Sequence, residues 1–116
     1  MNLDEYQREA KTFAIYPVDM NIIYPSLGLC GESGEVAEKV KKWIRDDGFI
    51  KTMMTNQPRM APRTYEIEKE LGDVLWYLAN LATDLGLSLG AIAQLNLDKL
   101  EDRKKRNVIK GEGDDR

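Results

Sequence analysis

The chain has 116 residues, of which 42% are hydrophobic and 32% are charged, and its net charge is −3. This length and balance indicate one globular domain and exclude a disordered chain. The acidic excess argues against general binding to nucleic acid or to an anionic membrane surface. Because histidine is absent and Cys30 is the sole cysteine, an internal disulfide, a Ser-His-Asp triad, a Cys-His pair and histidine-rich metal sites are all excluded.

Three features of the sequence indicate a location in the cytoplasm. A single cysteine fits a reducing compartment. The N-terminal stretch MNLDEYQREAK lacks the basic-then-apolar pattern of a secretion signal. No apolar run approaches the roughly 20 residues that span a bilayer. We therefore expect a cytoplasmic protein with no nucleic-acid partner and no membrane partner.

Two helices are predicted in the N-terminal half. The first covers Leu3 to Ala14, where apolar residues recur at helical spacing and Pro17 follows. The second covers Pro25 to Asp46, because proline is accepted in a first turn and Gly48 is a natural stop.

The segment 48–63 shows no clean period and contains Pro58 and Pro62. We interpret it as a loop or a partly helical excursion. A connection of this length is often a functional lid, and a tolerated insertion is the alternative. We predict a single domain over 1–110 that includes this segment. The glycine-rich, acidic residues 111–116 are predicted to form a flexible tail.

Two more helices are predicted in the C-terminal half. The third covers Thr64 to Asp84, with Thr64 as its N-cap and Gly86 as its end. The fourth covers Ser88 to Arg106, with Ser88 as its N-cap. The apolar positions expected to face inward are Ile67, Leu71, Val74, Leu78, Leu81, Leu85, Ile92, Leu95 and Leu100. With no strand pattern in the sequence, the predicted fold is all-α, a four-helix bundle.

Acidic residues recur at three-residue spacing on the second and third predicted helices. Glu32 and Glu35 share one helix face, a further step reaches Glu38, and Glu70 and Asp73 repeat the spacing. At about 100° per residue, these acids border the core-facing stripes instead of lying opposite them. If the two helices pack antiparallel, the two acidic pairs converge on one polar pocket.

Carboxylates brought together without partners repel one another. A hard divalent cation removes this repulsion, and Mg²⁺ or Mn²⁺ suits a set of ligands made only of oxygen. Gly34 and Gly72 each lie inside an acidic pair, ESGE and ELGD, where a glycine permits close approach of a neighbouring helix or a ligand.

The alternative is a solvated helix face, in which each acid pairs with a lysine on its own helix. The spacing allows Glu35 to pair with Lys39, Glu38 with Lys42, and Glu66 with Lys69 or a neighbour. Both acidic motifs together, each split by a glycine and each beside an apolar stripe, favour the metal site.

The segments GLCGESGEVAEKVKKWIRD and EIEKELGDVLWYLANLATDLGLSL resemble the MazG-like, all-α nucleoside triphosphate pyrophosphatases. The family signature is Glu-x-x-Glu followed by Glu-x-x-Asp, and the resemblance covers residues 26–110. It implies a four-helix unit that forms a homodimer or a dimer of dimers. It also implies Mg²⁺-dependent hydrolysis of nucleoside triphosphates to monophosphate and pyrophosphate, often to clear non-standard nucleotides. The interval from Glu35 to Glu70 is longer than usual for the family, which puts pocket shape and substrate choice in doubt.

The resemblance also implies roles for individual residues. The metal ligands would be Glu32, Glu35, Glu70 and Asp73. The phosphate-facing residues would be Asn96, Lys99 and Arg103, for which ordinary surface charge is the alternative. Tyr77 matches an aromatic position near the base.

Two further roles are expected from the mechanism and the spacing. Asn80 lies on the same stripe as Asp73 and would hydrogen-bond the base, unless this stripe packs at the bundle or dimer seam. The general base would be Glu35 or Glu38. Two rival functions stay open: a non-enzymatic helical adaptor, and a related enzyme acting on another phosphorylated metabolite such as phosphoribosyl-ATP.

Overall fold

The computed structural model describes residues 1–55 and 61–116. These residues form α-helices and one short 3-10 helix, and none of them lies in a strand. In chain order the elements are α1 (Leu3–Lys11), η1 (Val18–Met20), α2 (Ile23–Asp46), α3 (Phe49–Met54), α4 (Pro62–Asp84) and α5 (Leu89–Lys105). The all-α class predicted from the sequence is therefore confirmed.

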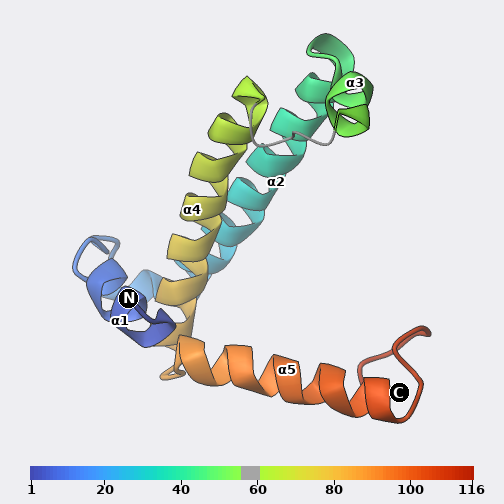
Figure 1. Cartoon of the computed structure of the whole chain (residues 1–116). Coiled ribbons are helices and arrows are strands. Elements are labelled where there is room, and N and C mark those ends of the chain that lie inside the picture. The colour runs from blue at the N-terminus through green and yellow to red at the C-terminus, as the bar shows by residue number, and fades with distance from the viewer. Residues whose placement is uncertain (56–60) are drawn as a thin grey trace.

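The long helices α2 and α4 pack antiparallel along most of their length (Figure 1). The chain reverses between them through α3, where the buried Trp43 of α2 meets Phe49 edge-on at 5.2 Å between ring centroids. The segment 48–63 is thus a partly helical excursion in its first half. The prediction for residues 56–60 falls outside the described part of the chain.

A small core joins α1, α4 and α5. Its buried members are Ala10, Ala79 and Leu89, against which Tyr6 and Trp76 pack. The two alanines allow α1 to approach α4 closely, because neither side chain extends beyond Cβ. This junction lies at the end of the α2–α4 pair opposite to α3 (Figure 1).

The last helix, α5, leaves the α2–α4 pair at a bend of 101° (Figure 1). Gly86, with φ of 71°, supplies the left-handed backbone after α4 that the sequence predicted. Ser88 is the N-cap of α5, as predicted, and its hydroxyl accepts a hydrogen bond from the Ala91 N–H at 3.0 Å.

Side chains of α1 complete the cap of α5. Asp4 accepts hydrogen bonds from the Ser88 hydroxyl at 2.8 Å and from the Gly90 N–H at 2.9 Å. Gln7 accepts a bond from the Leu89 N–H at 2.7 Å. These bonds satisfy N–H groups that an isolated helix would leave without partners, so α1 determines the direction in which α5 leaves the fold.

Asp84 ties the segment between α1 and α2 to the end of α4. Its carboxylate is 1% exposed and accepts hydrogen bonds from the Tyr16 hydroxyl at 2.8 Å and the Ile22 N–H at 2.9 Å. The Lys11 ammonium lies 3.7 Å away. Ile22 has a φ of 70°, which a β-branched residue adopts only when its surroundings enforce it.

Several local predictions were wrong. The first helix ends at Lys11 instead of Ala14, because the chain turns there toward Asp84. The third predicted helix begins at Pro62, with Ala61 and not Thr64 as its N-cap. Four of the apolar positions expected to face inward are exposed: Leu71 at 53%, Leu85 at 50%, Leu95 at 72% and Leu100 at 40%. The two on α5 are exposed because the bend carries this helix away from the α2–α4 pair.

Within the described ranges, no single helix is long and apolar enough to span a membrane, although the bent pair α4 and α5 passes that test by length and composition alone.

Candidate metal centre

The acids of the two helices meet, as the spacing predicted. Glu32 of α2 and Glu70 and Asp73 of α4 each offer a carboxylate oxygen, and these oxygens lie within 4.8 Å of one another. Three-residue spacing places Glu70 and Asp73 on one face of α4, and the antiparallel packing brings Glu32 opposite them. The donor set contains oxygen alone, which fits a hard divalent cation such as Mg²⁺ or Mn²⁺.

The electrostatics of this group show that the carboxylates repel one another. The pKa of Glu32 is raised by burial, then by the negative charges of Asp73, Glu70 and Glu35, and by a hydrogen bond to the Glu70 carboxyl. Burial and the neighbouring negative charges therefore disfavour the ionised form of Glu32 relative to a solvated carboxyl group. A bound divalent ion would provide a compensating positive charge.

Glu35 and Glu38 lie differently with respect to this group. Glu35 is close enough for its charge to raise the pKa of Glu32, but its carboxylate is not among the three that converge. Glu38 lies 2.8 Å from the Lys41 ammonium and 3.8 Å from that of Lys42. The pKa of Glu38 is lowered, first by its hydrogen bond to Lys41, which weakens this carboxylate as a proton acceptor.

Tyr77 lies one helical turn beyond Asp73 and packs on α2. Its ring covers Gly28, where an added Cβ would overlap Cδ1 and Cε1 and lie 2.5 Å from Cζ. The ring centroid is 6.3 Å from that of Tyr24, which in turn stacks on Tyr16 at 4.9 Å. The pKa of the Tyr77 hydroxyl is raised by burial and by nearby groups that include Glu32, which places this aromatic side chain beside the acids.

The close approach occurs at Gly28 and not at the glycines that the sequence analysis selected. At Gly31, Gly34 and Gly72 an added Cβ would find no other atom within 4 Å. Within the described part of one chain these three positions face open space, so no neighbouring helix of the same chain approaches Gly34 or Gly72, and the alternative, close approach of a ligand, stays a prediction. They leave the acidic face accessible to a ligand or to a second copy.

The remaining predicted site residues lie elsewhere. Asn80 is completely buried, and its amide donates to the Trp76 carbonyl of the same helix at 3.0 Å. Asn96 and Lys99 lie on α5, where they line a hollow of about 520 Å³ with Asp114. Because α5 leaves the α2–α4 pair, a single chain does not bring these groups to the acids (Figure 1).

The tail folds back on Arg103 of α5. Arg103 is 5% exposed, and its Nη2 donates to the Asp114 carbonyl at 2.5 Å. The Asp114 carboxylate lies 3.3 Å from the Lys99 ammonium. The flexibility predicted for residues 111–116 stays a prediction, but in this structure the tail occupies the two cations assigned to substrate phosphates.

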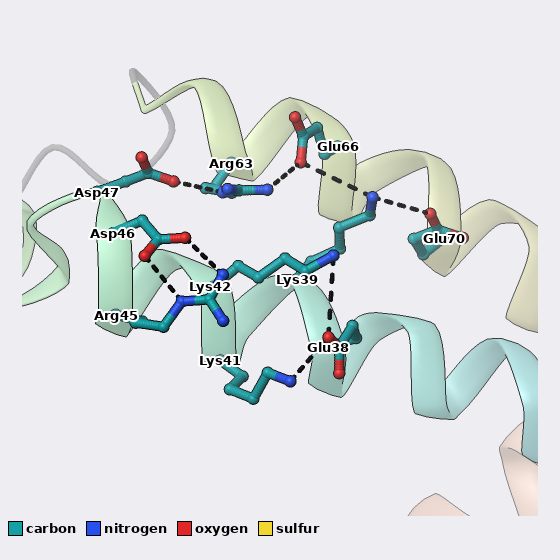
Figure 2. A network of polar contacts seen from close by, with 10 residues as sticks. All are labelled: Glu38, Lys39, Lys41, Lys42, Arg45, Asp46, Asp47, Arg63, Glu66 and Glu70. Atoms are coloured by element: carbon teal, nitrogen blue, oxygen red, sulfur yellow. Dashed lines mark hydrogen bonds and ion pairs between the residues drawn. The ribbon is translucent and has the colours of Figure 1, made fainter.

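Sequence reasoning missed the partner of Lys39. The solvated-face alternative allowed this lysine to pair with Glu35 on its own helix, but its ammonium crosses to α4 and lies 3.9 Å from Glu66 and 4.0 Å from Glu70 (Figure 2). The pairing of Glu38 with Lys42 was predicted correctly. Spacing along one helix reveals only partners on that helix. The sequence pattern therefore gave no indication that Lys39 contacts an acid of the metal site.

An antiparallel helical pair with three converging carboxylates defines an all-α protein with a candidate site for a divalent cation. A scan against family models matches residues 26–108, well over half of the chain, to the MazG nucleotide pyrophosphohydrolase domain. The chain therefore belongs to this family.

A relative of the same length class supports the match. The chain is similar to Gene 37 protein of Mycobacterium phage L5, with 46% identity over 123 residues that cover all of both chains. No solved structure matches the chain.

Proposed function

We propose that this protein is a Mg²⁺-dependent nucleoside triphosphate pyrophosphohydrolase, which converts a ribo- or deoxyribonucleoside triphosphate and water to the monophosphate and pyrophosphate. The observation that carries the proposal is the convergence of the Glu32, Glu70 and Asp73 carboxylates from two helices. Family membership supports the reaction class. Clearing of non-standard nucleotides is the role we propose for it.

Each residue of the candidate site has a proposed role. Glu32, Glu70 and Asp73 would hold the ion, with Glu35 beside them as a further ligand or as the general base. A bound divalent ion supplies charge stabilisation at the phosphates and acidifies a water molecule. Of the two candidate bases we favour Glu35, because Glu38 is tied to Lys41 and its pKa is lowered. Tyr77 would contact the nucleoside next to the acids.

A homodimer or a dimer of dimers would complete the site. The phosphate-facing residues implied by the resemblance lie on α5, away from the acids of their own chain. The same helix exposes Leu95 and Leu97, which are 72% and 60% accessible, as an apolar surface without cover in the single chain. We propose that α5 of a second copy supplies Asn96, Lys99 and Arg103, and that the substrate phosphates displace Asp114 from the two cations. A cytoplasmic location, proposed from the single cysteine, suits a nucleotide substrate.

The decisive experiment is a metal-dependent assay over canonical and damaged nucleoside triphosphates, with products identified by mass. We expect monophosphate and pyrophosphate with Mg²⁺ present, and loss of both products in Glu70→Gln. Glu68→Gln is the matched control, because Glu68 is exposed on the same helix two residues earlier and outside the converging group. Including phosphoribosyl-ATP in the panel tests the rival substrate class.

Three results would count against the proposal. Release of orthophosphate would remove the pyrophosphohydrolase assignment. Absence of both turnover and metal binding would favour the adaptor. Equal loss of activity in Glu68→Gln and Glu70→Gln would show that the converging carboxylates have no special part in the reaction.

A further inference from the structure

Lys39 places its ammonium group beside one of the candidate metal ligands. Its ammonium lies 4.0 Å from Oε1 of Glu70 and 3.9 Å from Oε2 of Glu66, and its side chain is 25% exposed. The neighbouring lysines of α2, Lys41 and Lys42, pair instead with Glu38 on their own helix. Figure 2 shows Lys39 pointing across to α4 while Lys41 points away from it.

Lys39 is held in place from its other side. Glu66, its second partner, also accepts a hydrogen bond from Nη1 of Arg63 at 2.8 Å. Arg63 is 19% exposed and pairs in addition with Asp47 at the end of α2. The charges therefore alternate along the α2–α4 seam, from Asp47 through Arg63, Glu66 and Lys39 to Glu70 (Figure 2). Partly buried charges of this kind are screened less by salt than exposed pairs.

The position of Lys39 has two consequences of opposite sign for the acids. Its positive charge relieves the repulsion among carboxylates that have no ion between them. The same charge lies against Glu70, a candidate ligand, and so repels any cation that Glu70 accepts. Both effects follow from Coulomb's law, and both require the ammonium group and not the length of the side chain.

We propose that Lys39 is the resident counter-ion of this metal centre: it holds the Glu70 carboxylate when no divalent ion is bound, and a divalent ion must compete with it for that carboxylate. The inference rests on the proposed function, because it takes Glu32, Glu70 and Asp73 as metal ligands. It assigns Lys39 as a positioning residue that weakens the affinity of the site for the ion and keeps the acids assembled without it.

The test is binding of Mn²⁺ or Mg²⁺ to the full chain, without nucleotide, by electron paramagnetic resonance or titration calorimetry. Unit charges about 4 Å apart in water interact by an energy that corresponds to roughly fivefold in an equilibrium constant. We therefore expect Lys39→Met to bind the ion roughly fivefold more tightly than the native chain. Lys39→Arg keeps the charge and should bind like the native chain.

The matched control is Lys42→Met, which removes an ammonium three residues along the same helix that pairs with Glu38. This variant should bind the ion like the native chain. The effect of Lys39→Met should shrink as salt is added, and it should vanish in a Glu70→Gln background, because the two side chains then no longer interact. Without metal, Lys39→Met should unfold at lower urea than Lys42→Met, and saturating Mg²⁺ should remove this difference.

Metal affinity that is unchanged or weaker in Lys39→Met would overturn the counter-ion assignment. The proposed function would survive that result, provided that the native chain binds Mn²⁺ and releases pyrophosphate. If the native chain neither binds Mn²⁺ nor hydrolyses nucleotides, the proposed function and the inference fail together. If Lys39→Met does not fold, Lys39→Gln provides the same loss of charge and the same expectation.

Discussion

The packing of Tyr77 on Gly28 predicts the sign of a change in the free energy of unfolding. Carbon atoms in contact lie about 3.5–4.0 Å apart, whereas the Cβ of Gly28→Ala would lie 2.5 Å from Cζ of Tyr77 and overlap two further ring atoms. The ring or the helix must move by about 1 Å. Since Gly28 lies within α2, opposite α4, this strain falls on the contact that joins the two long helices.

The magnitude comes from two opposing terms. Overpacking costs about 1–3 kcal/mol, and an overlap with a ring held by Tyr24 belongs at the upper end. Replacing glycine by alanine in a helix returns about 1 kcal/mol. We expect Gly28→Ala to lower the free energy of unfolding by about 2 kcal/mol, which is about 8 °C in Tm for a chain of this size.

Urea denaturation at low protein concentration measures this change without a contribution from association. Gly34→Ala and Gly72→Ala are controls of opposite sign, because nothing lies within 4 Å of either added Cβ and only the gain of about 1 kcal/mol remains. In a Tyr77→Ala background, Gly28→Ala should become stabilising as well. The reasoning is refuted if Gly28→Ala is as stable as the native chain while Tyr77 is intact.

Three further predictions follow from other contacts. Tyr16→Phe removes the hydroxyl that donates to the buried Asp84 carboxylate, so we expect a loss of about 1.5 kcal/mol in urea melts; Tyr65→Phe, on an exposed ring, should change little. The pKa of Asp4 is lowered by its hydrogen bonds to the Gly90 N–H and to Ser88, so the ionised carboxylate stabilises the folded state. This contribution is complete above the ordinary pKa of 3.8 and is lost as the pH falls below it. Asp4→Asn should remove that part of the acid unfolding transition. Leu95→Glu should lower the mass found by light scattering if α5 joins two copies, and an unchanged mass would contradict that arrangement.

Patterns along the chain predicted the elements and the convergence of the acids. Three-residue spacing places Glu70 and Asp73 on one face regardless of what surrounds them, so their meeting with Glu32 needed only the antiparallel packing of two helices. Ser88 could be predicted as an N-cap because serine is a preferred residue at that position. Its hydroxyl accepts from the N–H three residues later on the same helix. Both are local relationships.

The features that the sequence did not predict depend on contacts between distant residues. After the early end of α1, the Tyr16 hydroxyl donates to Asp84, which is 68 residues away along the chain. The exposure of Leu95 follows from the bend after α4, because an apolar stripe indicates a face to be covered but not what covers it. The pairing of Lys39 with Glu70 likewise required knowledge of how two helices sit side by side.

Side chains of α1 cap the N-terminus of α5, although the two helices lie far apart along the chain. The oxygens of Gln7 and Asp4 accept from N–H groups that lie 82 and 86 residues further along the chain, so these bonds form only after all the intervening residues have been synthesised. The orientation of α5 is therefore fixed only after both helices have been made and brought together.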